Sequence, residues 1–258
     1  MSDKTSPAAN QRLRTIMSVA GMLPVLILLA IVFQMMSGRF MSVNNLSNVM
    51  QQASINIVLA SGMTFVILTG GIDLSVGSIL ATSAMVAVIV SLIPEFGWLG
   101  VPAAMLVGLA CGLANGILIS ALKLPPFIVT LGSLTAVRGI ARLLGNDTTV
   151  FNPDLPFDVI GNGSLFGIPW LAIIAVAVIV LSWFILKRTV LGTWIYATGG
   201  NPEAARLTGI KVPLVLLFVY GISGLFAGLG GAMAAALVGV IGLSMFGNDV
   251  TRIETRAG

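Results

Sequence analysis

Four amide side chains with regular spacing are the first residues in this sequence whose chemistry stands out. They recur every three or four positions, at Asn45, Asn48, Gln52 and Asn56, and therefore share one face of a helix. Amides both donate and accept hydrogen bonds, which suits a hydroxyl-rich ligand. Within a membrane they are costly without partners, so we expect this stripe to face protein or a water-filled translocation pathway. A helix end that reaches the lipid headgroups is an equal alternative.

A carboxylate and a hydroxyl lie in the run Gly70-Gly71-Ile72-Asp73-Leu74-Ser75. Asp73 and Ser75 are typical N-cap residues for a helix that begins after them, and capping is a sufficient explanation for both. The functional alternative places them in the translocation pathway as a proton or ion site. No second carboxylate or His is present nearby to relay a proton from Asp73.

Two arginines interrupt an apolar stretch between residues 127 and 145. Arg138 and Arg142 are four residues apart and lie on one helix face. Arg142 is close enough to the helix end to snorkel, whereas Arg138 lies about 10 Å deep at 1.5 Å per residue. We expect Arg138 to face the bundle interior or a pathway. A short or re-entrant helix after Pro125-Pro126 is the alternative.

The remaining composition excludes most enzyme chemistry. The chain has no His, and its one cysteine, Cys111, lies in an apolar run. Imidazole metal sites, histidine proton relays and Ser-His or Cys-His catalysis are therefore excluded. No Gly-Lys dipeptide occurs, so the chain has no Walker A phosphate loop. We predict no catalytic residue, no metal site and no cofactor.

The elements that must position these residues are membrane helices. Of 258 residues, 57% are hydrophobic and 9% are charged, with a mean hydropathy of +1.05. Charge-free runs long enough to span a bilayer recur along the chain. We predict an all-α polytopic membrane protein with about seven transmembrane segments. They are expected at residues 16–36, 53–70, 75–93, 98–119, 127–145, 169–186 and 213–241.

The basic residues set the predicted orientation. The net charge is +4 and the isoelectric point is near 9.7, values that in a soluble protein suggest an acidic partner. Here the positive-inside rule explains them without a nucleic acid partner, and it places the N-terminus in the cytoplasm. A signal peptide is the alternative for the first segment, but no small-residue cleavage site follows it. The predicted inner positions are Lys4, Arg12, Arg14, Lys123, Lys187, Arg188, Arg206 and Lys211, against Arg39, Arg252 and Arg256 outside.

Small residues recur every four positions in the fourth segment. Gly108, Gly112 and Gly116 continue a series from Ala104 to Ser120, and the last segment carries Gly224 and Gly228. Such ridges let two helix backbones approach closely. Helix packing within the chain is the simple interpretation, and a sliding surface used in gating is the alternative.

A short capped helix is predicted in the inner loop 187–212. Asn201 is a suitable N-cap, Pro202 the first helical residue and Gly209 the terminator. An interfacial helix is one interpretation, but we favour a helix that docks a partner. The residues proposed for this role are Asn201, Pro202, Glu203, Ala204, Ala205, Arg206, Leu207 and Gly209.

Three segments of the sequence resemble one transporter family. They are residues 44–48 with 69–78, residues 124–132, and residues 199–210, and together they extend the similarity from about residue 15 to 235. They are similar to the permease subunits of bacterial ATP-binding-cassette importers for monosaccharides of the ribose, xylose and arabinose type.

The resemblance implies a set of partners in the bacterial inner membrane. The helix at 203–210 would couple to a separate ATPase subunit, and a periplasmic binding protein would deliver a monosaccharide. Two permease chains, a homodimer in the simplest case, would form the pore. A secondary transporter or channel that acts alone is the alternative function.

The C-terminus departs from the family pattern. The sequence divides into a cytoplasmic tail at 1–15, a transmembrane domain at 16–243 and an atypical polar tail at 244–258. Family members continue with further spans where this tail occurs. We therefore expect a permease that is truncated or whose reading frame is altered near its C-terminus. A nonfunctional fragment is the third hypothesis for its function.

Overall fold

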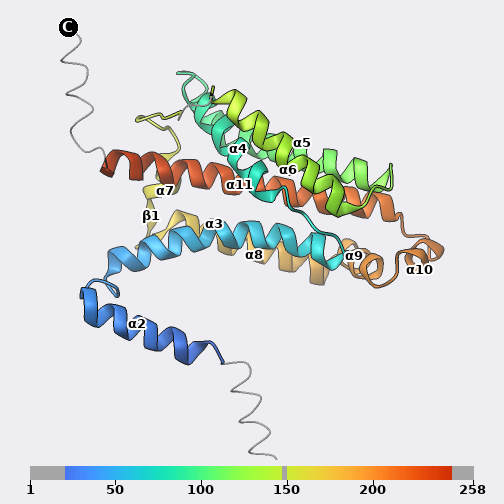
Figure 1. Cartoon of the computed structure of the whole chain (residues 1–258), viewed down its shortest axis with the longest axis horizontal. Helices are drawn as coiled ribbons and strands as arrows, with labels where there is room; N and C mark the ends of the chain where they lie inside the picture. The colour runs from blue at the N-terminus through green and yellow to red at the C-terminus, as the bar shows by residue number, and fades with distance from the viewer. Residues whose placement is uncertain (1–20, 147–149, 246–258) are drawn as a thin grey trace, which may run out of the picture. The chain divides into compact units, whose positions relative to one another are not determined.

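The computed structural model describes residues 21–146 and 150–245, with side chains up to residue 238. It forms two units, divided between Val49 and Met50, which are described separately. The helices, labelled in Figure 1, are α2 (Leu23–Ser37), α3 (Val43–Leu68), α4 (Val76–Ser91), η1 (Gly97–Leu99), α5 (Gly100–Ser120), α6 (Pro126–Leu144), α7 (Asp158–Asn162), α8 (Trp170–Arg188), α9 (Val190–Gly200), α10 (Pro202–Leu207) and α11 (Val212–Met245). Two short strands, β1 (Ser164–Leu165) and β2 (Ile168–Pro169), form an antiparallel hairpin.

The all-α polytopic prediction is confirmed. Five helices in the described part of the chain are long and apolar enough to cross a membrane, namely α3, α5 with η1, α6, α8 and α11. Two shorter apolar helices, α2 and α4, correspond to the first and third predicted segments. The start of the first segment, residues 16–20, lies outside the described residues. At 19 residues, α6 has the length of a full crossing, which favours a complete span over a re-entrant helix.

Two predicted boundaries are wrong for an understandable reason. The second segment is predicted to start at Ala53, but α3 begins ten residues earlier, at Val43. Amides lower the hydropathy of residues 44–52 without disturbing the backbone hydrogen bonds of a helix. The last segment likewise continues past Ile241 to Met245 in α11. Hydropathy therefore locates the apolar part of each helix and not its ends.

In the second unit, α11 is the central helix. In its membrane-spanning stretch about 61% of the residues are buried, against 22–33% in the other four spans. Figure 1 shows α11 alongside α4 and α5. Its side chains join the main apolar cluster, in which Val219 and Tyr220 pack with Phe65 of α3 and Leu171 of α8.

Helices α5 and α11 meet backbone to backbone at their glycines. A Cβ added to Gly112 would clash with the carbonyl oxygen of Tyr220 and lie 3.0 Å from the Cα of Gly224. A Cβ added to Gly108 would clash with the carbonyl oxygen of Gly224, and one on Gly228 would lie 2.5 Å from the oxygen of Ala104. The ridge at Ala104, Gly108, Gly112 and Gly116 therefore packs within this chain against Leu217, Gly224 and Gly228.

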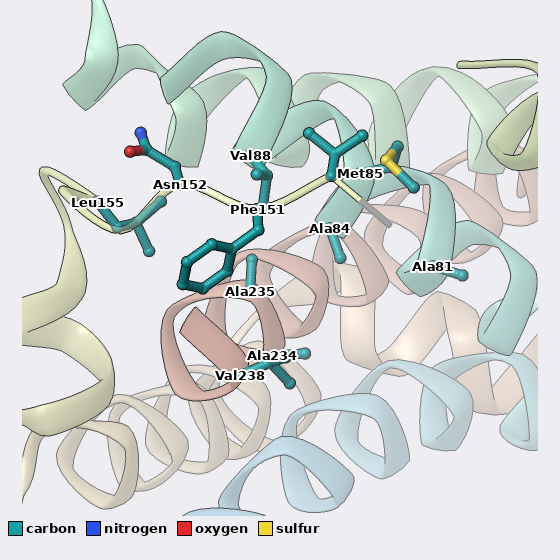
Figure 2. A pocket seen from close by; sticks show the side chains of 11 residues that line it. Ala81, Ala84, Met85, Val88, Phe151, Asn152, Leu155, Ala234, Ala235 and Val238 are labelled. Atoms are coloured by element: carbon teal, nitrogen blue, oxygen red, sulfur yellow. The ribbon is translucent and has the colours of Figure 1, made fainter. Parts of the chain in front are cut away.

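The segment between α6 and α8 lies at the end of the second unit that is opposite to α10 (Figure 1). Gln51 Nε2 donates a hydrogen bond to the carbonyl oxygen of Gly161 (3.0 Å), and Asn152 Nδ2 donates to Ser91 (2.9 Å to Oγ). The helix α7 and the β-hairpin in this segment are absent from the sequence prediction, because each is too short for a periodic signal. An apolar cavity of about 220 Å³ lies between this segment, α4 and α11 (Figure 2). Its lining offers almost no polar group to a hydroxyl-rich ligand.

The glycine packing leads to a stability prediction. Gly112→Ala places a methyl group against the α11 backbone, where overpacking costs about 1–3 kcal/mol. Gly139→Ala is the matched control, because nothing lies within 4 Å of a Cβ built there and alanine is the better helix former. We expect a lower unfolding temperature in detergent for Gly112→Ala alone. An equal effect of the two substitutions would contradict the packing.

Candidate functional site

Three loops come together at one end of the second unit. Loops 69–71 and 121–125 and the segment from Thr198 to Pro213 line one cavity of about 340 Å³, together with Tyr220 of α11. Alternate crossing of the membrane places these three loops on the same side, which the sequence predicts to be the cytoplasm. This end of the unit also carries α10.

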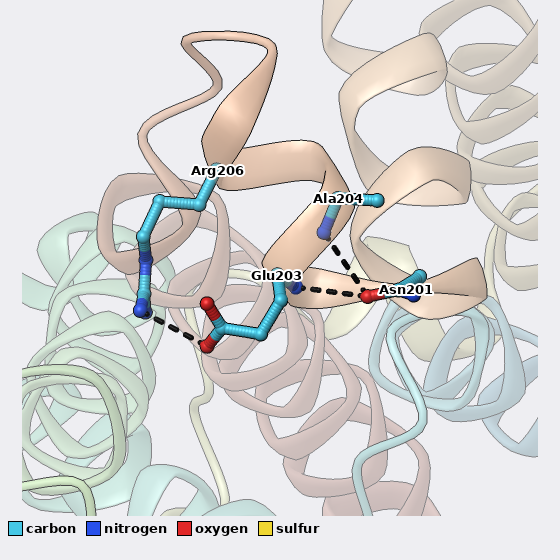
Figure 3. Close-up of polar contacts among 4 residues, drawn as sticks. All are labelled: Asn201, Glu203, Ala204 and Arg206. Carbon is cyan, nitrogen blue, oxygen red and sulfur yellow. Dashed lines mark hydrogen bonds and ion pairs between the residues drawn. The ribbon is translucent and has the colours of Figure 1, made fainter.

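The short helix α10 forms where the sequence predicts it. The Oδ1 atom of Asn201 accepts hydrogen bonds from the backbone N–H groups of Glu203 and Ala204, both at 3.0 Å (Figure 3). Pro202 occupies the first turn, where a missing N–H costs little. Gly209 adopts a φ of +89°, and the N–H of Ile210 behind it bonds to the carbonyl oxygen of Ala205 (3.1 Å). Local capping thus fixes both ends of a six-residue helix.

The outer surface of α10 is open. Only Ala205 is buried among the residues of this helix, whereas the Leu207 side chain is 89% exposed. Glu203 and Arg206 form an ion pair of 3.1 Å across one turn. Since both side chains are more than half exposed, the pair contributes little to stability. Its exposed groups are available to a partner.

The predicted inner loop 187–212 contains a helix that the sequence pattern does not reveal. Residues 190–200 form α9, and Lys187 and Arg188 belong to the last turn of α8. The Thr189 hydroxyl caps α9, and the Lys187 ammonium group lies 5.9 Å from the centre of the Tyr196 ring. The segment 187–212 is therefore a folded support for α10 and not an open loop.

Asp73 and Ser75 are not exposed to a pathway in this structure. Their exposed fractions are 2% and 0%, and they lie among α4, α5 and α11. Ser75 is the N-cap of α4, but its side chain makes no capping hydrogen bond. It instead donates to Asp73 Oδ1 (2.6 Å) and accepts from Asn115 Nδ2 (2.9 Å). The capping explanation is wrong for the Ser75 side chain, because these partners compete for its hydroxyl.

The amide stripe on α3 is exposed in the second unit. Gln52 and Asn56 point away from the buried side of α3, which holds Ser54, Val58 and Phe65. The same i, i+4 row continues through Ala60 to Thr64, both exposed. Between residues 52 and 64, this row therefore carries only polar or small side chains. The predicted stripe ends at Asn56 and does not include this continuation.

Asn48 belongs to the first unit and lines a polar depression there. The depression has a volume of about 600 Å³ and is lined by Ser37, Arg39, Phe40, Ser42, Asn44, Asn45 and Asn48. Asn45 Nδ2 donates to the carbonyl oxygen of Phe40 (2.8 Å), so this amide helps to hold the turn that forms the depression. That Asn48 continues the row of Gln52 remains a prediction from helical spacing.

Arg138 does not face the interior of its own chain, which corrects part of the prediction. It is exposed on α6, whereas Val137 and Ala141 form the buried face of this helix. A Cβ added to Gly132 or Gly139 of α6 would likewise meet open space. The exposed part of α6 is otherwise largely apolar, with Phe127, Ile128 and Ile140 among its exposed residues, so Arg138 is a charged group on a lipid-compatible face.

The site residues that sequence reasoning missed are long-range partners. Asn115, Ser223 and Tyr220 contact the loop around Asp73, but they lie on α5 and α11, far from it in sequence. Their polar types inside apolar helices were the available signal. Within residues 21–146 and 150–245, no three His, Cys, Asp or Glu side chains are grouped as metal ligands.

The family comparison agrees with this architecture. Residues 45–253 match the family model described as the permease component of branched-chain amino acid transport systems. The match covers more than half of the chain and extends into the tail at 244–258. No solved structure shows a significant match.

Curated relatives carry names of sugar permeases. The chain is 42% identical to a ribose import permease of Haemophilus influenzae over 221 residues, 82% of this chain and 67% of that protein. It is 38% identical to the ribose import permease of Escherichia coli K12, covering 86% and 70%. A fructose import permease of Bifidobacterium longum is 38% identical, with 80% and 59% covered.

These matches agree with the multi-pass helical architecture. The chain therefore belongs to this permease family, as a multi-pass inner-membrane transport protein and not an enzyme.

Proposed function

We propose that this chain is the membrane-spanning subunit of an ATP-binding-cassette importer for a ribose-like monosaccharide. A separate ATPase subunit binds α10 on the cytoplasmic side, and a periplasmic binding protein delivers the sugar. Two copies of the chain enclose the pathway. The observation that carries the proposal is α10, a helix that is capped at both ends and leaves its outer surface exposed.

The relatives supply the substrate class. They are named as ribose and fructose import permeases, and a further one, from Escherichia coli K12, is named as a D-allose permease at 37% identity. Their named substrates are all monosaccharides, which supports a sugar over an amino acid as the cargo. Because the chain has no Walker A sequence, ATP must be hydrolysed by another subunit.

The exposed surface of α10 supports docking. Leu207 projects an apolar side chain next to the charged pair Glu203 and Arg206. An apolar centre with a polar rim is the usual composition of a protein interface. The internal hydrogen bonds of α10 keep this surface in one conformation, which lowers the entropic cost of binding.

Exposed polar side chains on α3 and α6 support a pathway between two chains. Gln52 and Asn56 are costly if they face lipid, as is the Arg138 guanidinium. All three are exposed on the isolated chain. A water-filled pathway at an interface between two copies removes this cost and presents amides to sugar hydroxyls.

A secondary transporter that works alone fits the structure less well. It would need an ion-coupling carboxylate near the substrate. Asp73 is buried, and both of its carboxylate oxygens already accept hydrogen bonds within the protein. We therefore do not assign it to ion coupling.

Uptake into liposomes tests the proposed function. The chain, reconstituted with the ATPase of the same importer and its binding protein, is expected to accumulate labelled ribose only when ATP is supplied. Omission of the ATPase should abolish uptake. Uptake driven by a sodium or proton gradient without the ATPase would contradict the proposal.

Leu207→Ala tests the docking role of α10. Truncation of an apolar anchor costs about 2 kcal/mol, or about thirtyfold in affinity for the ATPase subunit. Val190→Ala is the control, because this exposed valine begins α9 outside the proposed docking surface. Binding is measured by titration of the purified ATPase onto the permease in nanodiscs. Equal affinities for the wild type and Leu207→Ala would refute docking at this residue.

Asn56→Leu tests the pathway on α3. Loss of the amide should reduce ribose uptake at least tenfold, about 1.4 kcal/mol, while the affinity for the ATPase stays unchanged. Ile57→Leu is the neighbouring control and should retain uptake. If Asn56→Leu transports as well as Ile57→Leu does, the stripe does not line the pathway.

A further inference from the structure

The Asp73 carboxylate is the centre of a buried hydrogen-bond network. Its Oδ1 atom accepts from the backbone N–H (3.0 Å) and the hydroxyl (2.6 Å) of Ser75. Its Oδ2 atom accepts from the Ser223 hydroxyl (3.0 Å) on α11. Asn115 on α5 donates to the Ser75 hydroxyl (2.9 Å). Asp73 thereby joins the start of α4 directly to α11, and Ser75 extends the network to α5.

The backbone next to Asp73 is held by α11 and by a further helix, α6. The carbonyl oxygen of Ile72 accepts hydrogen bonds from the hydroxyls of Tyr220 on α11 (3.3 Å) and Thr130 on α6 (3.4 Å). A Cβ added to Gly71 would lie 2.6 Å from the Tyr220 hydroxyl oxygen. Polar contacts thus fix the loop from Thr69 to Ser75 to three spanning helices. The partners in these contacts are 40 to 150 residues apart in sequence.

The other end of this loop touches the support of α10. A Cβ added to Gly199 of α9 would clash with the carbonyl oxygen of Leu68 and lie 3.3 Å from the Cα of Thr69. Helix α10 follows α9 after the single residue Asn201. A continuous series of contacts therefore runs from α10 through Gly199 and Thr69 to Asp73, and from there into α5 and α11.

We propose that Asp73 is a positioning residue that transmits movement of α10 to the α5–α11 pair. The inference rests on the proposed function, since it assumes that an ATPase moves α10. When α9 and α10 shift, the loop at Thr69 must shift with them, because no side chain separates Gly199 from the backbone of this loop. The hydrogen bonds of the Asp73 network then pass that shift on to α5 and α11. The direct backbone contact at their glycines leaves these two helices little room to move relative to each other.

The test must separate a loss of coupling from a loss of folding. The number of ribose molecules transported per ATP hydrolysed does this. A purely structural defect lowers the amount of active complex and reduces both rates together, which leaves the ratio unchanged. A coupling defect lowers the ratio.

Asp73→Ala is expected to lower the transport-to-hydrolysis ratio at least fivefold in the reconstituted importer. Asp73→Asn should keep it within twofold of wild type, because the amide oxygen still accepts from Ser75 and the Ser223 hydroxyl can accept from the amide nitrogen. Ser223→Ala, which removes only the α11 link, should lower the ratio by an intermediate factor. Thr82→Val is the control, because Thr82 makes a similarly buried hydrogen bond to Val137 away from this loop.

Gly199→Ala provides a second test that leaves Asp73 intact. The added methyl group displaces α9 from Leu68 and should lower the ratio at least threefold. The adjacent Gly200→Ala has nothing within 4 Å of its Cβ and should match wild type. This pair keeps the proposal testable if Asp73→Ala fails to fold.

The outcomes distinguish the two proposals. If the wild-type complex transports ribose and every variant keeps the wild-type ratio, Asp73 has only a structural role and this inference is overturned. If the wild-type complex itself shows no ATP-dependent uptake, the proposed function fails instead. A lowered ratio in Asp73→Ala or Ser223→Ala together with Gly199→Ala, with both controls unchanged, supports the transmission role.

Discussion

The close contact of α5 and α11 is the constraint on which the rest of the second unit depends. Helices in lipid gain nothing from leaving water, so their association requires direct backbone packing or hydrogen bonds. Gly112 and Gly224 supply the packing, and this packing also sets the positions of the polar residues beside them. Asn115 lies one helical turn after Gly112, and Ser223 precedes Gly224. The glycine contact therefore brings both hydrogen-bond donors to the level of the Asp73 loop.

The same constraint sorts the polar residues of the spans into two groups. One group is buried and hydrogen-bonded within the chain, as Thr82 is to Val137 and Asn115 is to Ser75. The other group is exposed on the outer faces of α3 and α6, where Gln52, Asn56 and Arg138 lie. The first group stabilises one arrangement of helices. The second is costly in lipid, and the pathway that we propose would remove this cost.

Sequence patterns predicted the features that arise from local physics. The spans follow from charge-free length, the glycine ridge from spacing, and α10 from the N-cap Asn201 and the terminator Gly209. The partners of Asp73 were not predictable, because Ser223 is 150 residues away and only the fold brings it near. Helix α9 was missed for a different reason. Its glycines and threonines are poor helix formers, and its packing against Leu68 and α8 outweighs that preference.

The position of Gly199 explains why such a poor helix former occupies the next-to-last residue of α9. A side chain at this residue would hold α9 away from the carbonyl oxygen of Leu68, whereas a Cβ on the adjacent Gly200 would touch nothing. The contact thus depends on the absence of a Cβ at one residue. In the importer that we propose, the ATPase subunit moves α10, and this displacement must reach the other helices. Direct backbone contact transfers it with less loss than a flexible side chain does, because it has no rotamers in which the movement can be absorbed.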